Sequence, residues 1–363
     1  MGERHSGWRR AGLFFLASLT AFLLFFAFNP EPTFRPQEHG IEISQRARRV
    51  HDEAVVIDLH VDSLLWPRDL SVAGLGGQVD FPRMRAGGLD VAAFTIPTAF
   101  FGVAGLKAFH DRWPMRTWFS PWARLQHQLR KMESFRDRGE ITITTDPSAL
   151  RQPGRLYGFH GIEGAHALEG DVERVRDLPK RGVVFIGVAH LTDNAFGASS
   201  SGGDGGLTPL GRRLLAEMNR AGVLVDLAHA SPQTFSDCLA LTELPPLVSH
   251  GGARAVNDSW RNSSDAQIRA VASRNGVIGV MLAPPALREP SLEEAIRHIE
   301  HIIAVGGEDV VALGSDFDGY VSPPIGADGL PALTELMLRR GFDEGRIQKI
   351  LGGNVLRLLE RTR

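Results

Sequence analysis

The chain has 363 residues, of which 43% are hydrophobic and 23% charged, which is typical of a globular protein long enough for one large, well-buried domain. Its net charge of −2 excludes the polycationic surface that nucleic-acid binding requires. Cys238 is the only cysteine, which excludes an intrachain disulfide framework and a cysteine-rich zinc site.

The first predicted element is an apolar run over residues 11–28, preceded by Arg4, Arg9 and Arg10. A helix of this length spans about 27 Å, close to the hydrocarbon thickness of a bilayer. No small-residue cleavage pattern follows, so we interpret the run as an uncleaved transmembrane anchor rather than a signal peptide. The arginines would keep the N-terminus in the cytoplasm and place the rest outside the cytoplasmic membrane, in the periplasm or extracellular space.

These features predict three parts. Residues 1–28 form a cytoplasmic stub and the anchor, residues 29–49 form a proline-containing linker, and residues 50–363 form the folded domain. In this domain short β-rich runs alternate with helical patterns. The eight candidate strands are residues 54–62, 89–98, 155–163, 183–191, 223–230, 246–250, 277–283 and 310–316.

Amphipathic stretches of helical length separate most of the strands. Residues 208–221 open with Thr-Pro, a favoured helix start, and residues 291–305 carry two glutamates in their first turn. We expect residues 104–140 to be the helical return after the second strand and residues 199–206 to be a mobile loop after the fourth. Eight strands alternating with helices predict a TIM-type (β/α)8 barrel. An open doubly wound sheet is disfavoured because no glycine-rich phosphate turn follows the first strand.

Ionisable residues end six of these strands, and in such a barrel the strand C-termini converge on one mouth. They are His60 and Asp62 on the first strand, Glu163 on the third, His190 on the fourth, His229 on the fifth, His250 on the sixth and Asp316 on the eighth. A single buried histidine is commonly a hydrogen-bonded core residue, and a single carboxylate at a strand end is commonly a helix cap. Together they favour a metal site, because burying so many charges without a cation would cost several kcal/mol each.

The local spacing agrees with this hypothesis. His60 and Asp62 are alternate residues of one strand, so their side chains face the same way about 6.6 Å apart and can reach one ion. Imidazole and carboxylate ligands without a thiolate suit a catalytic zinc ion with an open coordination position.

Six motifs follow one another along the chain: Asp58-Leu59-His60-Val61-Asp62, Ile162-Glu163-Gly164, Val225-Asp226-Leu227-Ala228-His229-Ala230-Ser231, Val248-Ser249-His250, Arg261-Asn262 and Gly314-Ser315-Asp316-Phe317-Asp318-Gly319. In these motifs and their order the chain resembles, from about residue 50 to Asn354, the membrane dipeptidase (renal dipeptidase) family, peptidase family M19. That family is a branch of the metal-dependent amidohydrolase superfamily.

The resemblance implies a role for each matching residue. His60 and Asp62 would bind a first zinc ion, His229 and His250 a second, and Glu163 would bridge both. Asp316 would transfer the proton, with Asp318 as its competitor for that role. His190 would polarise the scissile carbonyl or hold the oxyanion, and Arg261 would bind the carboxylate of the substrate. The family also suggests a homodimer.

The resulting expectation is a zinc-dependent dipeptidase in which a hydroxide shared by two zinc ions attacks the amide carbon. N-acyl amino acids or cyclic amides such as β-lactams are alternative substrates for the same site. An inactive, anchored binding protein is less favoured, because no ligand is missing. The single cysteine and the polar C-terminus differ from the disulfide-linked, lipid-anchored vertebrate members, so the chain resembles the bacterial type. Residues 190–197 also differ, so no side-chain preference is inherited.

Overall fold

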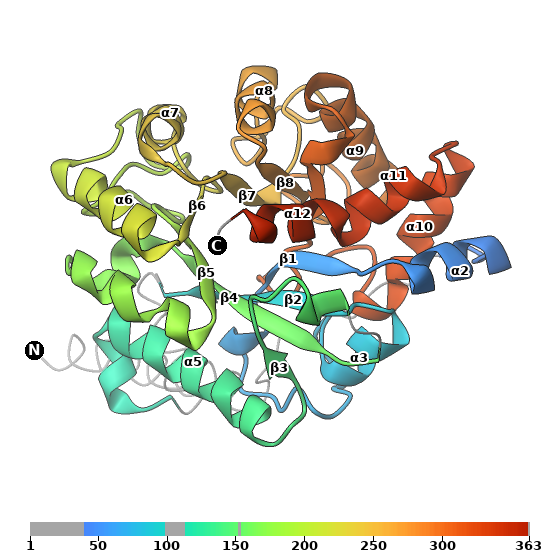
Figure 1. Cartoon of the computed structure of the whole chain (residues 1–363), viewed down its shortest axis with the longest axis horizontal. Helices are drawn as coiled ribbons and strands as arrows, with labels where there is room; N and C mark the ends of the chain where they lie inside the picture. The colour runs from blue at the N-terminus through green and yellow to red at the C-terminus, as the bar shows by residue number, and fades with distance from the viewer. Residues whose placement is uncertain (1–39, 99–112, 152–153, 362–363) are drawn as a thin grey trace, which may run out of the picture.

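The computed structural model describes residues 40–98, 113–151 and 154–361. Within these ranges nine parallel strands form one sheet, and eight of them close into a barrel, with β2 pairing to β4 and β9 pairing back to β1 (Figure 1). In their order around the barrel the strands are β1 (Ile57–Val61), β2 (Val91–Pro97), β4 (Tyr157–Glu163), β5 (Val183–Gly187), β6 (Leu224–Asp226), β7 (Leu247–Gly251), β8 (Val277–Val280) and β9 (Val311–Leu313).

Helices surround the barrel on its outside (Figure 1). They are α2 (Gln45–Glu53), α3 (Phe81–Ala86), α5 (Pro121–Asp137), α6 (Pro209–Ala221), α7 (Pro232–Leu241), α8 (Asp265–Ser273), α9 (Leu292–Gly306), α10 (Leu330–Arg339), α11 (Glu344–Gln348) and α12 (Asn354–Glu360). Every residue of the eight barrel strands is buried, as expected for a parallel sheet covered on both faces.

The predicted barrel is confirmed, and all eight predicted strands are present. Most strands end earlier than predicted, because the backbone leaves the extended region where the polar residues begin. His229 and Asp316, for example, have φ values of 62° and 63°, which no strand residue adopts. A ninth strand, β3 (Thr142–Ile143), pairs with β4 outside the barrel. Two residues are too short to show a period-2 pattern in the sequence.

The helix predictions depend on capping residues that the structure confirms. The Thr208 hydroxyl accepts a hydrogen bond from the Gly211 amide at 3.1 Å and starts α6, and Ser291 caps α9 in the same way. Of the predicted return over residues 104–140, α5 accounts for the second half, and residues 99–112 lie outside the described residues. The predicted loop 199–206 is hydrogen-bonded to the turn after β6, where the Ser200 amide donates to the His229 carbonyl oxygen at 2.8 Å.

Two buried apolar clusters hold the layers together. The larger joins the barrel to the surrounding helices. The second joins the first residues of several strands, such as Ile57, Tyr157 and Leu224, to Leu356 and Leu359 of α12. Helix α12 therefore closes the N-terminal end of the barrel, across the foreground of Figure 1, and leaves the opposite end for the polar residues.

The folded domain begins before residue 50. Helix α2 starts at Gln45, inside the segment assigned to the linker, and buries Ala47, Val50 and His51. Ser44 caps this helix, and its hydroxyl also donates to Glu335 of α10 at 2.6 Å. Helix α2 is thereby fixed to the outside of the barrel beside α10 (Figure 1).

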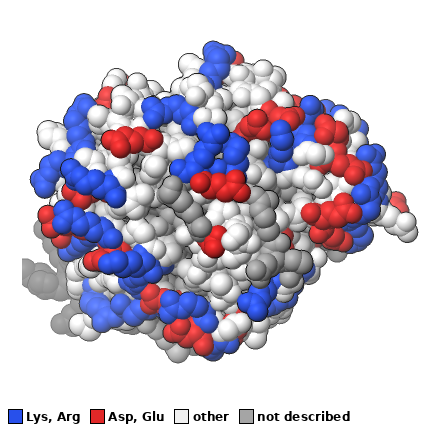
Figure 2. Space-filling model, in the orientation of Figure 1, with Lys and Arg blue, Asp and Glu red and all other residues white. Residues whose placement is uncertain are grey.

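The predicted transmembrane segment, residues 11–28, lies outside the described residues. Among the helices that the structure does describe, none combines the length and the apolar character needed to cross a bilayer. Basic and acidic side chains are interspersed over the face shown in Figure 2, so that face carries no extended field of one sign.

Candidate metal centre

The polar residues predicted for the site, seven at strand ends and Arg261 in the loop after the sixth predicted strand, meet at one end of the barrel. Seven of the eight line a single cavity of about 430 Å³: Asp62, Glu163, His190, His229, His250, Arg261 and Asp316. The eighth, His60, is fully buried directly beneath the cavity. Residues separated by more than 250 positions in the chain are thus brought within one pocket, because each follows the C-terminal end of a parallel strand.

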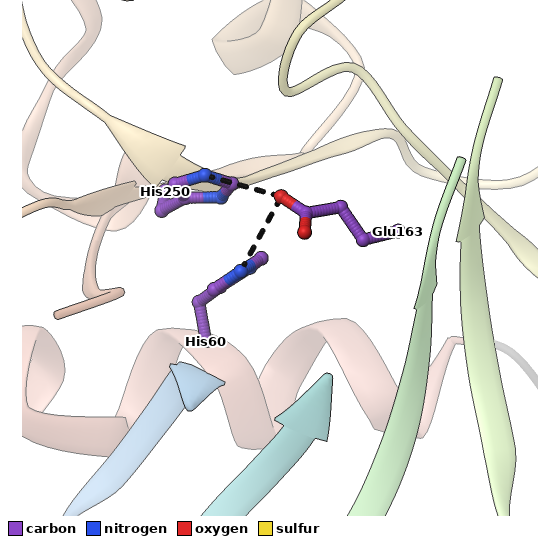
Figure 3. A group of neighbouring side chains, drawn as sticks. All are labelled: His60, Glu163 and His250. Atoms are coloured by element: carbon purple, nitrogen blue, oxygen red, sulfur yellow. Dashed lines mark ion pairs between the residues drawn. The ribbon is translucent and has the colours of Figure 1, made fainter. Parts of the chain in front are cut away.

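Glu163, the last residue of β4, lies at the centre of this group. Its Oε1 atom is 3.6 Å from Nε2 of His60, 3.6 Å from Nε2 of His250 and 3.0 Å from Nε2 of His229. Figure 3 shows the first two imidazoles converging on that oxygen. Its Oε2 atom is 3.3 Å from Nε2 of His190. One carboxylate therefore faces four imidazoles.

Three overlapping groups have ligand atoms within 4.8 Å of one another: His60, Glu163 and His250; Glu163, His190 and His229; and His60, Asp62 and Asp316. Glu163 is shared by the first two groups and His60 by the first and third. The buried Nε2 atom of His60 has no hydrogen-bond partner among the described residues, although three carboxylates lie within 4.0 Å of it. A buried nitrogen left without a hydrogen bond in a ring of carboxylates fits a metal ligand.

Burial determines the protonation of the group. It lowers the pKa values of His60, His229 and His250 well below the usual range and that of His190 to about 3, so these imidazoles are neutral.

Burial has the opposite effect on the acids. Together with neighbouring carboxylates it raises the pKa of Asp62 to about 7 and those of Glu163 and Asp316 well above the usual range. Neutral imidazoles beside crowded acids form a donor set that divalent cations stabilise, because the cations neutralise the carboxylates.

Asp316 and Asp318 have different surroundings, although both follow β9. Asp316 faces the cavity, and its Oδ1 atom is 3.9 Å from Nε2 of His60. The carboxylate of Asp318 accepts hydrogen bonds from the Ser63 hydroxyl, the Arg68 guanidinium and, at 2.7 Å, the Gln78 amide. All its oxygens are occupied away from the cavity, so Asp316 is the carboxylate that is free to act there.

The loop after β9 adopts its shape at a cost. Asp316, Asp318 and Tyr320 all have positive φ values, between 63° and 67°, a conformation that costs a non-glycine residue about 1–2 kcal/mol. Gly319 packs so closely that a Cβ atom there would lie 2.1 Å from Oδ1 of Asp316. The loop therefore holds the Asp316 carboxylate in one position.

Arg261 enters the same cavity from the loop after β7. Its side chain is buried, and its guanidinium donates a hydrogen bond to Nε2 of His250. Apolar side chains also line the cavity, among them Leu191, Trp260 and Met281. A buried cation thus lies beside the candidate metal ligands in a cavity whose lining is partly apolar.

Several residues at the site were not assigned a role from the sequence. Thr95 of β2 donates to Oδ1 of Asp62, and Ser249 of β7 contacts both His60 and His250. Ser249 is in turn hydrogen-bonded to Asp226 of β6. Ser249 and Asp226 lie inside motifs that the sequence singles out, and their position next to ligand-bearing strand ends was the available signal.

A (β/α)8 barrel whose strand C-termini gather four imidazoles and three carboxylates around a cavity is a barrel-type metallohydrolase. The chain belongs to the membrane dipeptidase family, peptidase family M19, whose family model matches residues 44–363. The predicted membership is thereby confirmed, and the match begins at the residue that caps α2.

Individual relatives agree with this assignment. The dipeptidase aclJ of Aspergillus oryzae is 29% identical over an alignment that covers 97% of this chain and 89% of that protein. An uncharacterized dipeptidase of Schizosaccharomyces pombe is 33% identical, and the alignment covers 59% of this chain and 55% of that protein. A metallopeptidase of Rhodobacter sphaeroides, solved with a phosphinate mimic of the dipeptide L-Ala-D-Ala, is 29% identical with a TM-score of 0.75, covering 86% of this chain and 100% of that one.

Proposed function

We propose that this chain is a zinc-dependent dipeptidase that hydrolyses the amide bond of dipeptides in the cavity above Glu163. The observation that carries the proposal is the position of Glu163, whose two oxygens face His60, His229 and His250 on one side and His190 on the other. The solved relative from Rhodobacter sphaeroides, which holds a mimic of a dipeptide, supports the choice of substrate class.

We propose two zinc ions per chain, as the resemblance to the membrane dipeptidase family implies. His60 and Asp62 would hold one, His229 and His250 the other, and Glu163 both, which leaves each ion with three protein ligands and an open position. Zinc in such a site supplies Lewis acidity and lowers the pKa of water toward neutrality.

The remaining residues divide the chemistry among them. Asp316, held facing the cavity, takes the proton of the attacking water and delivers it to the leaving amine. His190 presents a neutral imidazole on the far side of Glu163 and donates a hydrogen bond to the oxyanion. Arg261 binds the terminal carboxylate through two parallel hydrogen bonds.

The position of Arg261 also explains a limit of two residues. Its side chain is buried and lines the same cavity as His250, so a carboxylate that it binds would lie close to the metal ligands. The cavity of about 430 Å³ is of a size that suits a small molecule rather than a long peptide. Only the bond nearest the C-terminus of the substrate can then reach the site.

The proposal is tested with the full chain, purified without chelators. We expect close to two zinc ions per chain by elemental analysis and hydrolysis of a panel of dipeptides, including those with a D-residue at the C-terminus. N-acyl amino acids and β-lactams in the same panel test the alternative substrates. One zinc ion or fewer with full activity would refute the binuclear site, and preference for acylated or cyclic amides would refute the dipeptidase.

We also propose that residues 11–28 anchor the enzyme and place the barrel outside the cytoplasmic membrane, as a homodimer. The arginine-led apolar run in the sequence supports the anchor and the location, and the family resemblance suggests the dimer. An alkaline phosphatase fused after residue 45 should be active and membrane-bound, and an inactive fusion or a mature N-terminus near residue 30 would contradict the anchor. Light scattering of detergent-solubilised protein distinguishes a dimer from a monomer.

A further inference from the structure

One hydroxyl group connects two of the candidate metal ligands. The Oγ atom of Ser249 is 3.0 Å from Nδ1 of His60 and 3.0 Å from Nδ1 of His250. It is also 2.6 Å from Oδ2 of Asp226. All four residues are buried, and Ser249 is fully so. In the proposed site His60 and His250 belong to different zinc ions, so Ser249 touches a ligand of each.

The directions of these hydrogen bonds follow from what each atom can donate. Oδ1 of Asp226 accepts the backbone amides of Ala228 at 3.0 Å and Ser249 at 2.8 Å, so the carboxylate is held with Oδ2 toward the serine. A carboxylate accepts only, which means that the single hydroxyl proton of Ser249 goes to Oδ2. The serine oxygen is then left to accept from both imidazoles.

Both rings must therefore carry their proton on Nδ1 and a lone pair on Nε2. These are the nitrogens that face Glu163. Without metal, the guanidinium of Arg261 donates to this same Nε2 atom of His250, so it would have to release the lone pair when a zinc ion binds there.

The packing around Ser249 keeps this arrangement in place. A Cβ atom added at Gly279 would lie 2.1 Å from the carbonyl oxygen of Ser249, and one added at Gly314 would lie 1.9 Å from the same oxygen. The two glycines of the neighbouring strand segments thus allow the serine backbone to lie where its hydroxyl reaches both rings.

We infer that Asp226 and Ser249 are positioning residues that fix His60 and His250 in the tautomer able to bind metal, and that they do so for both zinc ions through one hydroxyl. The inference rests on the proposed zinc site. Partners of this kind orient ligand histidines and commonly change metal affinity by about 10–100-fold when removed.

Asp226→Asn reverses the direction of the hydrogen bond between residue 226 and the Ser249 hydroxyl. The amide oxygen must stay on the two backbone amides, so the amide nitrogen replaces Oδ2 and donates to Ser249. The serine proton then goes to one imidazole, which must move its own proton to Nε2 and can no longer bind metal. We expect the folded variant to lose about one zinc ion per chain, or to bind it about 10–100-fold more weakly, in competition with a chelator.

Asp58→Asn is the matched control. Asp58 repeats the backbone contacts of Asp226, since its Oδ1 atom accepts the amides of His60 and Ser315 at 3.0 Å each, and within the described part of the chain no hydrogen bond joins its side chain to an imidazole ring. This control should keep the wild-type zinc stoichiometry and affinity, whatever its effect on melting temperature.

Ser249→Ala supplies the second test and removes the acceptor of both rings. Zinc affinity should fall at both sites, and adding Asp226→Asn to Ser249→Ala should change affinity no further. If Asp226 acted only by accepting backbone amides, the losses of zinc affinity caused by the two substitutions would instead be additive.

The measurements are zinc stoichiometry, zinc affinity and melting temperature of the full-length protein. Wild-type protein with fewer than two zinc ions would refute the proposed site itself. Wild-type protein with two zinc ions, together with unchanged affinity in Asp226→Asn and Ser249→Ala or additive effects in the double variant, would overturn only the tautomer inference.

Discussion

Substitution of Asp316 and Asp318, the two aspartates after β9, should affect two different properties, kcat in the first case and thermal stability in the second. Asp316→Asn removes the carboxylate that faces the cavity and leaves an amide that cannot carry a proton. Loss of general acid–base catalysis typically costs 10²–10⁴-fold in kcat, or about 2.7–5.5 kcal/mol in the activation free energy. Because Asp316 is not one of the proposed zinc ligands, zinc content and melting temperature should stay close to those of the wild type.

Asp318→Asn should have the opposite effect. The substitution removes the negative charge of Asp318, which is the buried partner of Arg68. The side chain of Arg68 is itself only 9% exposed. Breaking a buried ion pair costs about 3–5 kcal/mol, which for a domain of this size lowers the melting temperature by roughly 4–8 °C. At a temperature where the variant is folded, kcat should remain within a few-fold of the wild type, because the carboxylate of Asp318 faces away from the cavity.

The assay measures kcat on one dipeptide, zinc content and the melting temperature for both variants. A normal kcat in Asp316→Asn with an inactive, stable Asp318→Asn would refute the assignment. Loss of zinc from Asp316→Asn would show instead that this carboxylate binds metal, as its proximity to His60 and Asp62 allows.

Three further predictions concern substrate binding and stability. The C-terminal amide of a good dipeptide should have a lower kcat/KM than the dipeptide, which corresponds to a loss of about 2–4 kcal/mol of transition-state binding. Arg261→Ala should abolish that difference. Equal discrimination in the mutant would show that Arg261 does not bind the substrate carboxylate. Because Leu191, Trp260 and Met281 line the cavity, dipeptides with apolar side chains should have kcat/KM values at least about tenfold higher than dipeptides with acidic or basic ones, and equal values would show that these side chains do not contact the substrate. Glu335→Gln should lower the free energy of unfolding by about 1 kcal/mol at pH 7, because hydrogen bonds from Ser44 lower the pKa of Glu335 to about 2. The lowered pKa means that this stabilisation is present above about pH 4 and is lost as the pH falls toward 2, so a difference that persists at pH 2 would contradict the assignment.

The sequence predicted the barrel because its strands and helices are locally regular. The β-rich runs and the capping residues, such as Thr208 before α6, are signals that lie within a few positions of each other. Strand ends were less predictable, because positive φ values at His229 and Asp316 depend on tertiary packing. The short β3 strand has no pattern of its own and exists only through its pairing with β4.

The site shows the same division. Which residues gather at the mouth followed from their places at strand ends, together with the resemblance to a known family. Their partners did not follow, since the contact of Ser249 with His60 joins strands far apart in the chain. The choice between Asp316 and Asp318 likewise needed the positions of Ser63 and Arg68, which the spacing of the two aspartates does not contain.

The docking of α2 has a mechanical consequence. The chain enters the barrel through this helix, whose cap is hydrogen-bonded to Glu335 and whose Arg46 and Arg49 pair with Glu344 of α11. Tension along the residues before Ser44 would therefore act on these contacts between helices before it reaches β1. If residues 11–28 are held in a bilayer as we propose, the contacts of α2 would protect the positions of His60 and Asp62 from tension in the preceding chain.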